Sequence, residues 1–388
     1  MSDEHFRASV LRSHGASNDE VAELSRYTRN MFDPGEARGL REYPAPDELF
    51  VEAWERYATE AQAAGAAECL RRRLVQLRFP IAAGMSTSAA YRVATRRGEI
   101  DASPYGEGLT LIHPKGVRIF IHETAAGRVP VVVAESRDDF VALVQALVHR
   151  NEPVQIPDSM GACIVAGYNN WDRIAELRTE WARDQGSEFS PEGWARVFRK
   201  IVPMKELYQD SFIILSTGPY SAIPARAMGL EDREWLEMSL TIRLEHECAH
   251  YFTRRILGSM RNSLLDELIA DYMGIVAAIG RYRADWFLRF MGLEAFPHYR
   301  SGGRLENYRG DPPLSEGALV VLRSLVRSAA QQLERFDALR VGPADAGRVI
   351  LTLARLGLET LASAESAELL GSIARDLNRK AGTEMTLV

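Results

Sequence analysis

The sequence contains very little cysteine. Its 388 residues include three, Cys69, Cys163 and Cys248, which lie far apart and form no C-x-x-C pair. Neither a disulfide framework nor a thiolate zinc site is therefore expected. A basic surplus is missing as well, because the formal net charge is -6. This charge argues against a nucleic-acid partner or an anionic membrane surface, since both need a basic face.

Long hydrophobic runs are also absent. The most apolar stretch, residues 268–280, is too short to span a bilayer and contains Asp271. The first ten residues, MSDEHFRASV, are polar and acidic, so no signal peptide is visible. With 46% hydrophobic and 26% charged residues, the composition is that of an ordinary globular protein. We therefore expect a soluble, cytoplasmic protein without a membrane partner; no pattern indicates an oligomeric state.

The first part of the chain predicts helices followed by a small sheet. Helical periodicity covers residues 19–32 and 46–78. Short β-branched runs separated by turn signals then predict an antiparallel meander. These runs cover residues 109–114, 116–123 and 128–135. Ser136 followed by Asp139 resembles a capping box at the start of a helix.

The second part is mainly helical. Residues 167–174 predict either a capped helix start with a packed tryptophan or a cleft element that contacts ligands. Ser190 and Pro191 have the cap-then-proline order of a helix start, and residues 210–218 predict a strand. From Glu231 onward the pattern is almost entirely helical. We thus predict an α+β protein with a mixed region of unknown role at 1–155 and a mostly helical region at 156–388.

One short segment of the helical region points to chemistry. RLEHECAHYF, residues 243–252, places His246 and His250 four apart, with Glu247 directly after the first histidine. Residues 231–257 contain no proline or glycine, so the spacing predicts one helix with both imidazoles on one face. One ring nitrogen of each histidine can then bind the same tetrahedral cation, at a nitrogen–metal distance of about 2 Å. The plainer alternative is a charged helix with two partly exposed histidines.

A third ligand is available on the next predicted helix. Residues 262–274, NSLLDELIADYMG, place Glu267 and Asp271 on one helical face. Two acids in so apolar a helix are costly to bury without a cation or hydrogen-bond partners. The alternative partners are Arg254, Arg255 and Arg261. The small residues that allow close approach to a neighbouring helix are Ala270, Gly274 and Ala278.

The two pairs, His246-Glu247-x-x-His250 and Glu267-x-x-x-Asp271, together resemble the gluzincin clan of zinc metallopeptidases, which have a thermolysin-like core. The resemblance implies a zincin-like fold around the site and one Zn²⁺ held by His246, His250 and Glu267. It also implies that Glu247 is the general base and that Asp271 orients a ligand histidine. The resemblance covers residues 246–274 and carries no information on residues 1–200.

The implied chemistry is hydrolysis. Three protein ligands leave one position open for water, as a catalytic zinc site requires. Glu247 would take a proton from that water and return it to the leaving amine. We therefore predict a zinc peptidase or amidase that acts on a peptide or small amide. In zincins an edge strand before the metal helix binds extended substrate; residues 211–220 are the candidate, and an interior strand is the equal alternative.

Candidates for substrate or oxyanion contacts lie in the polar, glycine-rich segment 296–310. This segment is too polar for a core, so a loop beside a cleft is expected. An ordinary surface role is the alternative for each of its residues. The candidates are His298, Tyr299, Arg304 and Tyr308, of which we favour His298 and Tyr308.

Two other functions fit the same ligands. Two histidines and one carboxylate also suit Fe²⁺ in a 2-oxoglutarate-dependent oxygenase that hydroxylates a peptide or an amino acid. The large N-terminal region, which a minimal peptidase does not need, is compatible with that alternative. A catalytically silent metal-binding protein is the third possibility. Glu247 counts against it, because a non-catalytic metal site has no need of that carboxylate.

Overall fold

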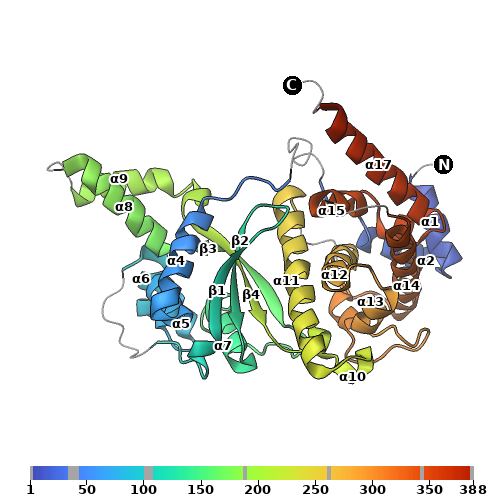
Figure 1. The fold of residues 1–388 in the computed structure, drawn as a ribbon, viewed down its shortest axis with the longest axis horizontal. Helices are drawn as coiled ribbons and strands as arrows, with labels where there is room; N and C mark the ends of the chain where they lie inside the picture. Colours follow the sequence, from blue (N-terminus) through green and yellow to red (C-terminus); the bar gives the residue numbers. More distant parts are fainter. Residues whose placement is uncertain are drawn as a thin grey trace. The chain divides into compact units, whose positions relative to one another are not determined.

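The chain folds into two compact units. A computed structural model describes residues 3–33, 43–99, 108–186, 190–259, 264–340 and 345–384. The helical unit comprises Met1–Ala45, Thr124–Ala126 and Pro219–Val388, and the sheet unit comprises Pro46–Glu123 and Gly127–Gly218 (Figure 1). The boundary predicted near residue 155 falls inside the sheet unit, because strands on both sides of it belong to one sheet.

The sheet unit is built on a mixed sheet of order β1-β2-β4-β3. Its strands are β1 Val117–His122, β2 Val129–Ala134, β3 Ala162–Asn169 and β4 Gln209–Ser216. The predicted antiparallel pairing of β1 with β2 is confirmed. The prediction of a purely antiparallel sheet is wrong, because β2 and β4 pair in parallel. Strand β4 has a partner strand on each side, so residues 211–216 lie in an interior strand and not in the edge strand of the other alternative. It therefore offers no free edge to a substrate.

Residues 109–114, predicted as a strand, are not one. The carboxylate of Asp139 accepts hydrogen bonds from the backbone nitrogens of Ile112, at 2.6 Å, and His113, at 2.8 Å. A side chain therefore satisfies backbone groups that a strand would satisfy through a ladder. The predicted capping box is not formed. Ser136 is the residue before α7 (Arg137–Leu147), but its side chain makes no capping bond, and both oxygens of Asp139 are bonded to Ile112 and His113.

Three helices cover one face of this sheet, α4 (Phe50–Ala64), α5 (Ala66–Arg73) and α7 (Figure 1). Alternate strand residues such as Val132, Ile214 and Val165 point into the core beneath these helices. Trp54 and Phe140 fill this core from the helical side. The remaining helices of the unit are α6 Ala89–Arg97, α8 Trp171–Gln185, α9 Pro191–Ile201, η1 Val75–Arg78, η2 Met85–Thr87, η3 Pro114–Gly116 and η5 Lys205–Leu207.

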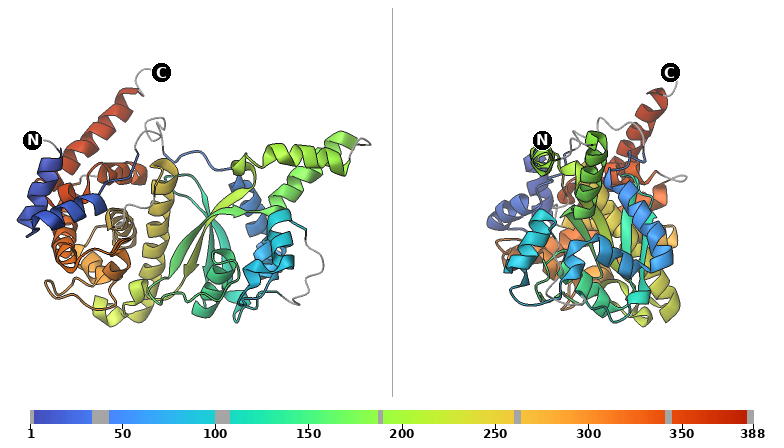
Figure 2. Two further views of the ribbon diagram at one scale, coloured as in Figure 1. Left: turned by 180° about the vertical axis from the view of Figure 1, so that it is seen from behind. Right: turned by 90° about the vertical axis from the view of Figure 1, so that its left-hand side faces the viewer.

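Helices α8 and α9 form a hairpin that extends away from the sheet (Figure 2). Residues 167–174 form the first of the two predicted alternatives, a capped helix start with a packed tryptophan, at the beginning of α8. The Asn170 side chain accepts hydrogen bonds from the next turn, and the Trp171 indole donates to the Thr95 carbonyl at 2.8 Å. The predicted helix start at Ser190 and Pro191 is also confirmed.

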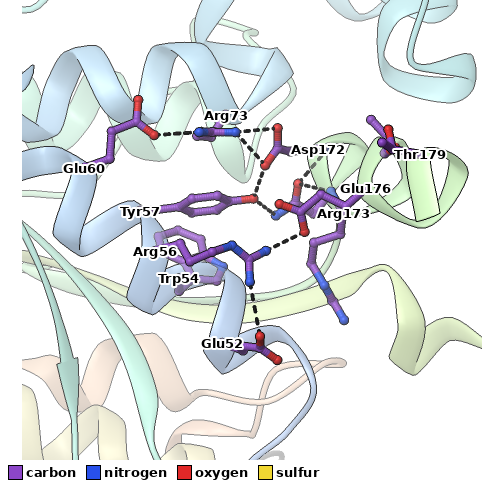
Figure 3. A network of polar contacts seen from close by, with 12 residues as sticks. Glu52, Trp54, Arg56, Tyr57, Glu60, Arg73, Asp172, Arg173, Glu176 and Thr179 are labelled. Carbon is purple, nitrogen blue, oxygen red and sulfur yellow. Dashed lines mark hydrogen bonds and ion pairs between the residues drawn. The ribbon is translucent and has the colours of Figure 1, made fainter. Parts of the chain in front are cut away.

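A buried polar network fixes α8 to the sheet. Asp210, fully buried in β4, accepts hydrogen bonds from the Trp54 indole at 2.8 Å and the Asn170 amide at 2.7 Å. Arg173 donates to the other oxygen of the same carboxylate at 2.6 Å. The network continues through Tyr57, whose hydroxyl donates to Asp172 at 2.7 Å, as Figure 3 shows. Its paired charges are Asp210 with Arg173 and Asp172 with Arg73.

The helical unit contains the two helices of the predicted site, α11 (Asp232–Ile256) and α12 (Leu264–Ile279). Early and late segments of this unit contact each other, since Arg7 in α1 donates to the buried Glu359 of α16 at 2.8 Å. Among the ranges that the structure describes, no helix has the length and apolar character needed to cross a membrane. The other helices of the unit are α1 Asp3–Ser13, α2 Asn18–Tyr27, η6 Tyr220–Ala222, α10 Ala225–Met228, α13 Ala284–Met291, η7 Arg304–Tyr308, α14 Glu316–Leu339, α15 Ala346–Ala354, α16 Leu358–Ala362 and α17 Ser366–Glu384.

Candidate metal centre

Helix α11 has the extent that its sequence predicts. Glu231 precedes it in extended conformation, acidic residues occupy its first turn, and Arg254 and Arg255 lie in its last turn. These charges oppose the partial charges at the helix ends and so stabilise the helix. His246, Glu247 and His250 lie in its second half and are all buried. The alternative of two partly exposed histidines is therefore excluded.

The three predicted ligands converge on one point. The Nε2 atoms of His246 and His250 lie 3.0 Å apart. The Glu267 carboxylate of α12 lies 3.4 Å from His250 Nε2 and 3.6 Å from His246 Nε2. A tetrahedral zinc ion about 2.0–2.2 Å from its ligands separates them by about 3.3–3.6 Å. The two distances to Glu267 match that separation, whereas the two histidine nitrogens lie closer together than a bound ion would hold them.

Glycine allows α12 to approach α11 closely, as the small residues predict. A Cβ atom on Gly274 would lie 2.5 Å from the backbone oxygen of Ile242 in α11. No side chain can occupy that space without moving a helix. Ala270, one turn earlier on α12, is fully buried. Close packing of the two helices is what brings Glu267 to the histidines.

We expect Gly274→Ala to separate the two helices and weaken both the fold and the site. Overpacking of this kind costs about 1–3 kcal/mol of unfolding free energy. Urea denaturation would measure that loss, and a zinc titration would show weaker binding. Gly371→Ala in α17 is the matched control, because its added Cβ would meet only the flexible end of Arg375 at 3.4 Å. Unchanged stability and zinc affinity in Gly274→Ala would contradict the close contact.

Asp271 orients the first histidine. Its carboxylate lies 2.9 Å from His246 Nδ1 and accepts a hydrogen bond from the Tyr220 hydroxyl at 2.5 Å. Because a carboxylate only accepts, we assign the imidazole proton to Nδ1, which leaves Nε2 free to bind a cation. Tyr220 begins η6, 26 residues from His246; the sequence marked it only as the end of the candidate strand 211–220, with no role at the histidines.

The second histidine has a different partner. Asp266 Oδ1 lies 3.3 Å from His250 Nδ1, although the two groups lack hydrogen-bond geometry. The Thr253 hydroxyl donates to the same oxygen at 3.1 Å and holds the carboxylate in place. Sequence reasoning missed Asp266; its position directly before Glu267 was the available signal.

The polar segment 296–310 contributes an arginine to the centre. Arg304 donates to Glu267 and, at 3.2 Å, to Asp271, so the two acids pair with an arginine that was not among the predicted Arg254, Arg255 and Arg261. Arg255 instead donates to the Ala126 carbonyl, and Arg261 lies outside the described residues. Tyr308 is half-buried, and burial together with nearby Glu267 raises its pKa well above the ordinary value. His298 is exposed and makes no side-chain contact with the centre in the described part of the chain.

Burial and charge set the protonation of the acids. Burial raises the pKa of Glu247, and the neighbouring histidines offset only part of that rise. Burial opposes ionisation of Glu267 too, but Arg304 and His250 hold the pKa of Glu267 well below its ordinary value. The pKa of Asp271 is likewise lowered against burial by Arg304 and His246. Glu267 is therefore an anion at neutral pH, as a ligand must be, and Glu247 accepts a proton more readily than Glu267 or Asp271.

Comparison with known proteins gives one match. The model of a family of unknown function, DUF7005, matches residues 9–365, a range that includes α11, α12 and Arg304. Neither the curated proteins nor the solved structures contain a match to this chain. Because the matched range covers most of the sequence, the chain belongs to the DUF7005 family of unknown function.

Proposed function

We propose that the protein is a metal-dependent hydrolase, most simply a zinc peptidase or amidase. The observation that carries the proposal is Glu247. The residue is buried within electrostatic range of His246, His250 and Glu267, and the described residues offer its carboxylate no hydrogen bond or ion pair. A buried carboxylate is normally paired. One without a partner beside a three-ligand cluster is placed to receive a proton during a reaction.

The charge of the centre also supports a cation. Four acids surround it, Glu247, Asp266, Glu267 and Asp271, and Arg304 is the one guanidinium described in contact with them. Burying an excess of negative charge is costly unless cations offset it, and without a metal His250, whose pKa Asp266 raises well above its ordinary value against burial, offsets part of it. A divalent ion on neutral histidines would bring the total close to zero. The residues present therefore fit a bound zinc ion.

A bound zinc ion supplies Lewis-acid chemistry, because it acidifies water and polarises a carbonyl group. Within this chain, Glu247 takes the proton of the attacking water and delivers it to the leaving nitrogen. Asp271 and Tyr220 keep the His246 proton on Nδ1. Tyr308, which retains its proton at neutral pH, is the donor available to a developing oxyanion. The exposed His298 is not positioned for that role.

The zincin-like fold is part of this proposal. Its support is the pair formed by α11, which carries the two histidines and Glu247, and α12, which carries Glu267 and Asp271. Fe²⁺ in a 2-oxoglutarate-dependent oxygenase remains the alternative for the same ligands. We favour hydrolysis, because a two-histidine, one-carboxylate iron site has no need of the unpaired Glu247.

Metal analysis tests the proposal. We expect protein purified without added metal, or reconstituted with one equivalent, to hold about one zinc per chain, since three protein ligands are preorganised. Elemental mass spectrometry would measure the stoichiometry. His250→Ala should lose the metal, whereas His298→Ala, which removes an exposed histidine of the same unit, should retain it. Iron with turnover of 2-oxoglutarate would favour the oxygenase, and no metal in either state would refute both.

A further inference from the structure

Arg304 is held in place by tightly packed backbone. It begins η7 directly after Gly303, and a Cβ on Gly303 would lie 2.6 Å from Gly292 Cα. The Tyr299 hydroxyl donates to the Gly303 carbonyl at 2.7 Å. The two glycines thus fix the chain against the end of α13. Arg304 therefore reaches the centre from a fixed position.

Its guanidinium is almost fully enclosed. Arg304 is 8% exposed, and one Nη atom donates to Glu267 Oε2. The other Nη atom lies 2.8 Å from the Tyr220 hydroxyl and 3.2 Å from Asp271 Oδ1. The guanidinium also lies over the Tyr220 ring, 5.4 Å from its centroid. Arg304 therefore contacts a predicted metal ligand, Glu267, and both groups that orient another ligand.

These contacts give Arg304 two opposing effects on a cation. Its hydrogen bonds keep Glu267 and Asp271 in position, which favours metal binding. Its positive charge, however, is paired with Glu267 Oε2, an atom that lies only 3.6 Å from His246 Nε2. A positive charge that is hydrogen-bonded to a ligand carboxylate in a buried site disfavours a second cation on that ligand. Because α12 already holds Glu267 through close helix packing, we expect the repulsion to dominate.

On the basis of the proposed metal site, we propose that Arg304 is an internal counter-cation. It pairs with Glu267 and Asp271 when no metal is bound, so that the centre stays formed, and it weakens the binding of a divalent ion. The centre can therefore lose its metal and bind it again without losing its structure.

Zinc titration against a chromophoric chelator tests this role. Arg304→Met removes the charge and the hydrogen bonds, and it should bind zinc at least about tenfold more tightly than the wild-type protein. The chelator-treated variant should also melt at a lower temperature than the wild type, because its acids are unpaired. Arg327→Met is the matched control, since Arg327 lies over the ring of Phe296 and leaves the acids untouched. It should bind zinc as the wild type does.

Arg304→Gln keeps a hydrogen-bond donor without the charge, and it serves as the second test if the methionine variant fails to fold. Tighter binding by this variant assigns the effect to charge. If Arg304 only oriented Glu267, its replacement would instead lower the zinc affinity of the protein about 10–100-fold. Equal or weaker zinc binding by the folded variants would overturn the counter-cation role alone. Absence of zinc binding by the wild-type protein would overturn the metal site, and this role with it.

Discussion

The Glu247→Gln variant is expected to bind zinc like the wild-type protein and to lose its hydrolytic activity. Glutamine has nearly the same shape but cannot accept the proton that the buried carboxylate receives. General-base catalysis is worth about 10²–10⁴-fold in rate, so we expect a loss in that range. A peptide library analysed by mass spectrometry would supply a cleaved substrate, and the rates of both proteins would then be compared on it.

The control for this change lies on the same helix. Glu237 is an exposed acid of α11 that pairs with Arg233, and Glu237→Gln should leave the rate unchanged. Zinc content must be measured in parallel, because loss of metal from Glu247→Gln would indicate that Glu247 is a ligand. Full activity in a zinc-loaded Glu247→Gln protein would show that another group accepts the proton.

The Asp210→Ala variant is expected to lose about 3–5 kcal/mol of unfolding free energy, as happens when one member of a buried ion pair is removed. Arg173 would remain buried without its carboxylate, and the donors of Trp54 and Asn170 would lose their acceptor. Such a loss is a large part of the total stability of an ordinary domain. Urea denaturation followed by tryptophan fluorescence would measure it.

An exposed pair of the same network provides the comparison. Arg56 and Glu176 are 47% and 39% exposed at their side chains, and Figure 3 shows them in the network with Arg173. Surface pairs contribute about 0–1 kcal/mol, so Glu176→Ala should change the stability little. If Asp210→Ala and Glu176→Ala destabilised the protein equally, burial would not be what makes the Asp210 pair important.

Local patterns predicted what depends on neighbours in the sequence. The helix expected over residues 231–257 is observed as Asp232–Ile256, because its end charges and its lack of glycine and proline act within a few turns. The four-residue spacings placed His246 with His250 and Glu267 with Asp271 for the same reason. The approach of the two helices was predictable as well, since Gly274 occupies the contact with Ile242.

Contacts between distant segments could not be predicted in this way. Tyr220 and Arg304 bond His246 and Glu267, which lie 26 and 37 residues away from them. The sequence marked Arg304 only as a possible substrate or oxyanion contact, and Tyr220 only as the end of the candidate strand 211–220. The parallel pairing of β2 with β4 depends on which strands meet in space, and periodicity carries no information on that. Asp139 fitted a capping pattern, but the backbone of Ile112 and His113 offered it stronger partners.

The division of the chain has a consequence for the order of folding. The sheet unit is formed from the middle of the sequence, whereas the helical unit needs both ends, as the bond between Arg7 and Glu359, 352 residues apart, illustrates. During synthesis, the sheet unit can fold as soon as its own residues have emerged. Helices α1 and α2 are made before the sheet unit yet must wait for α14 and α16, which are made after it. The unit that carries the centre is thus completed only after α16 has emerged.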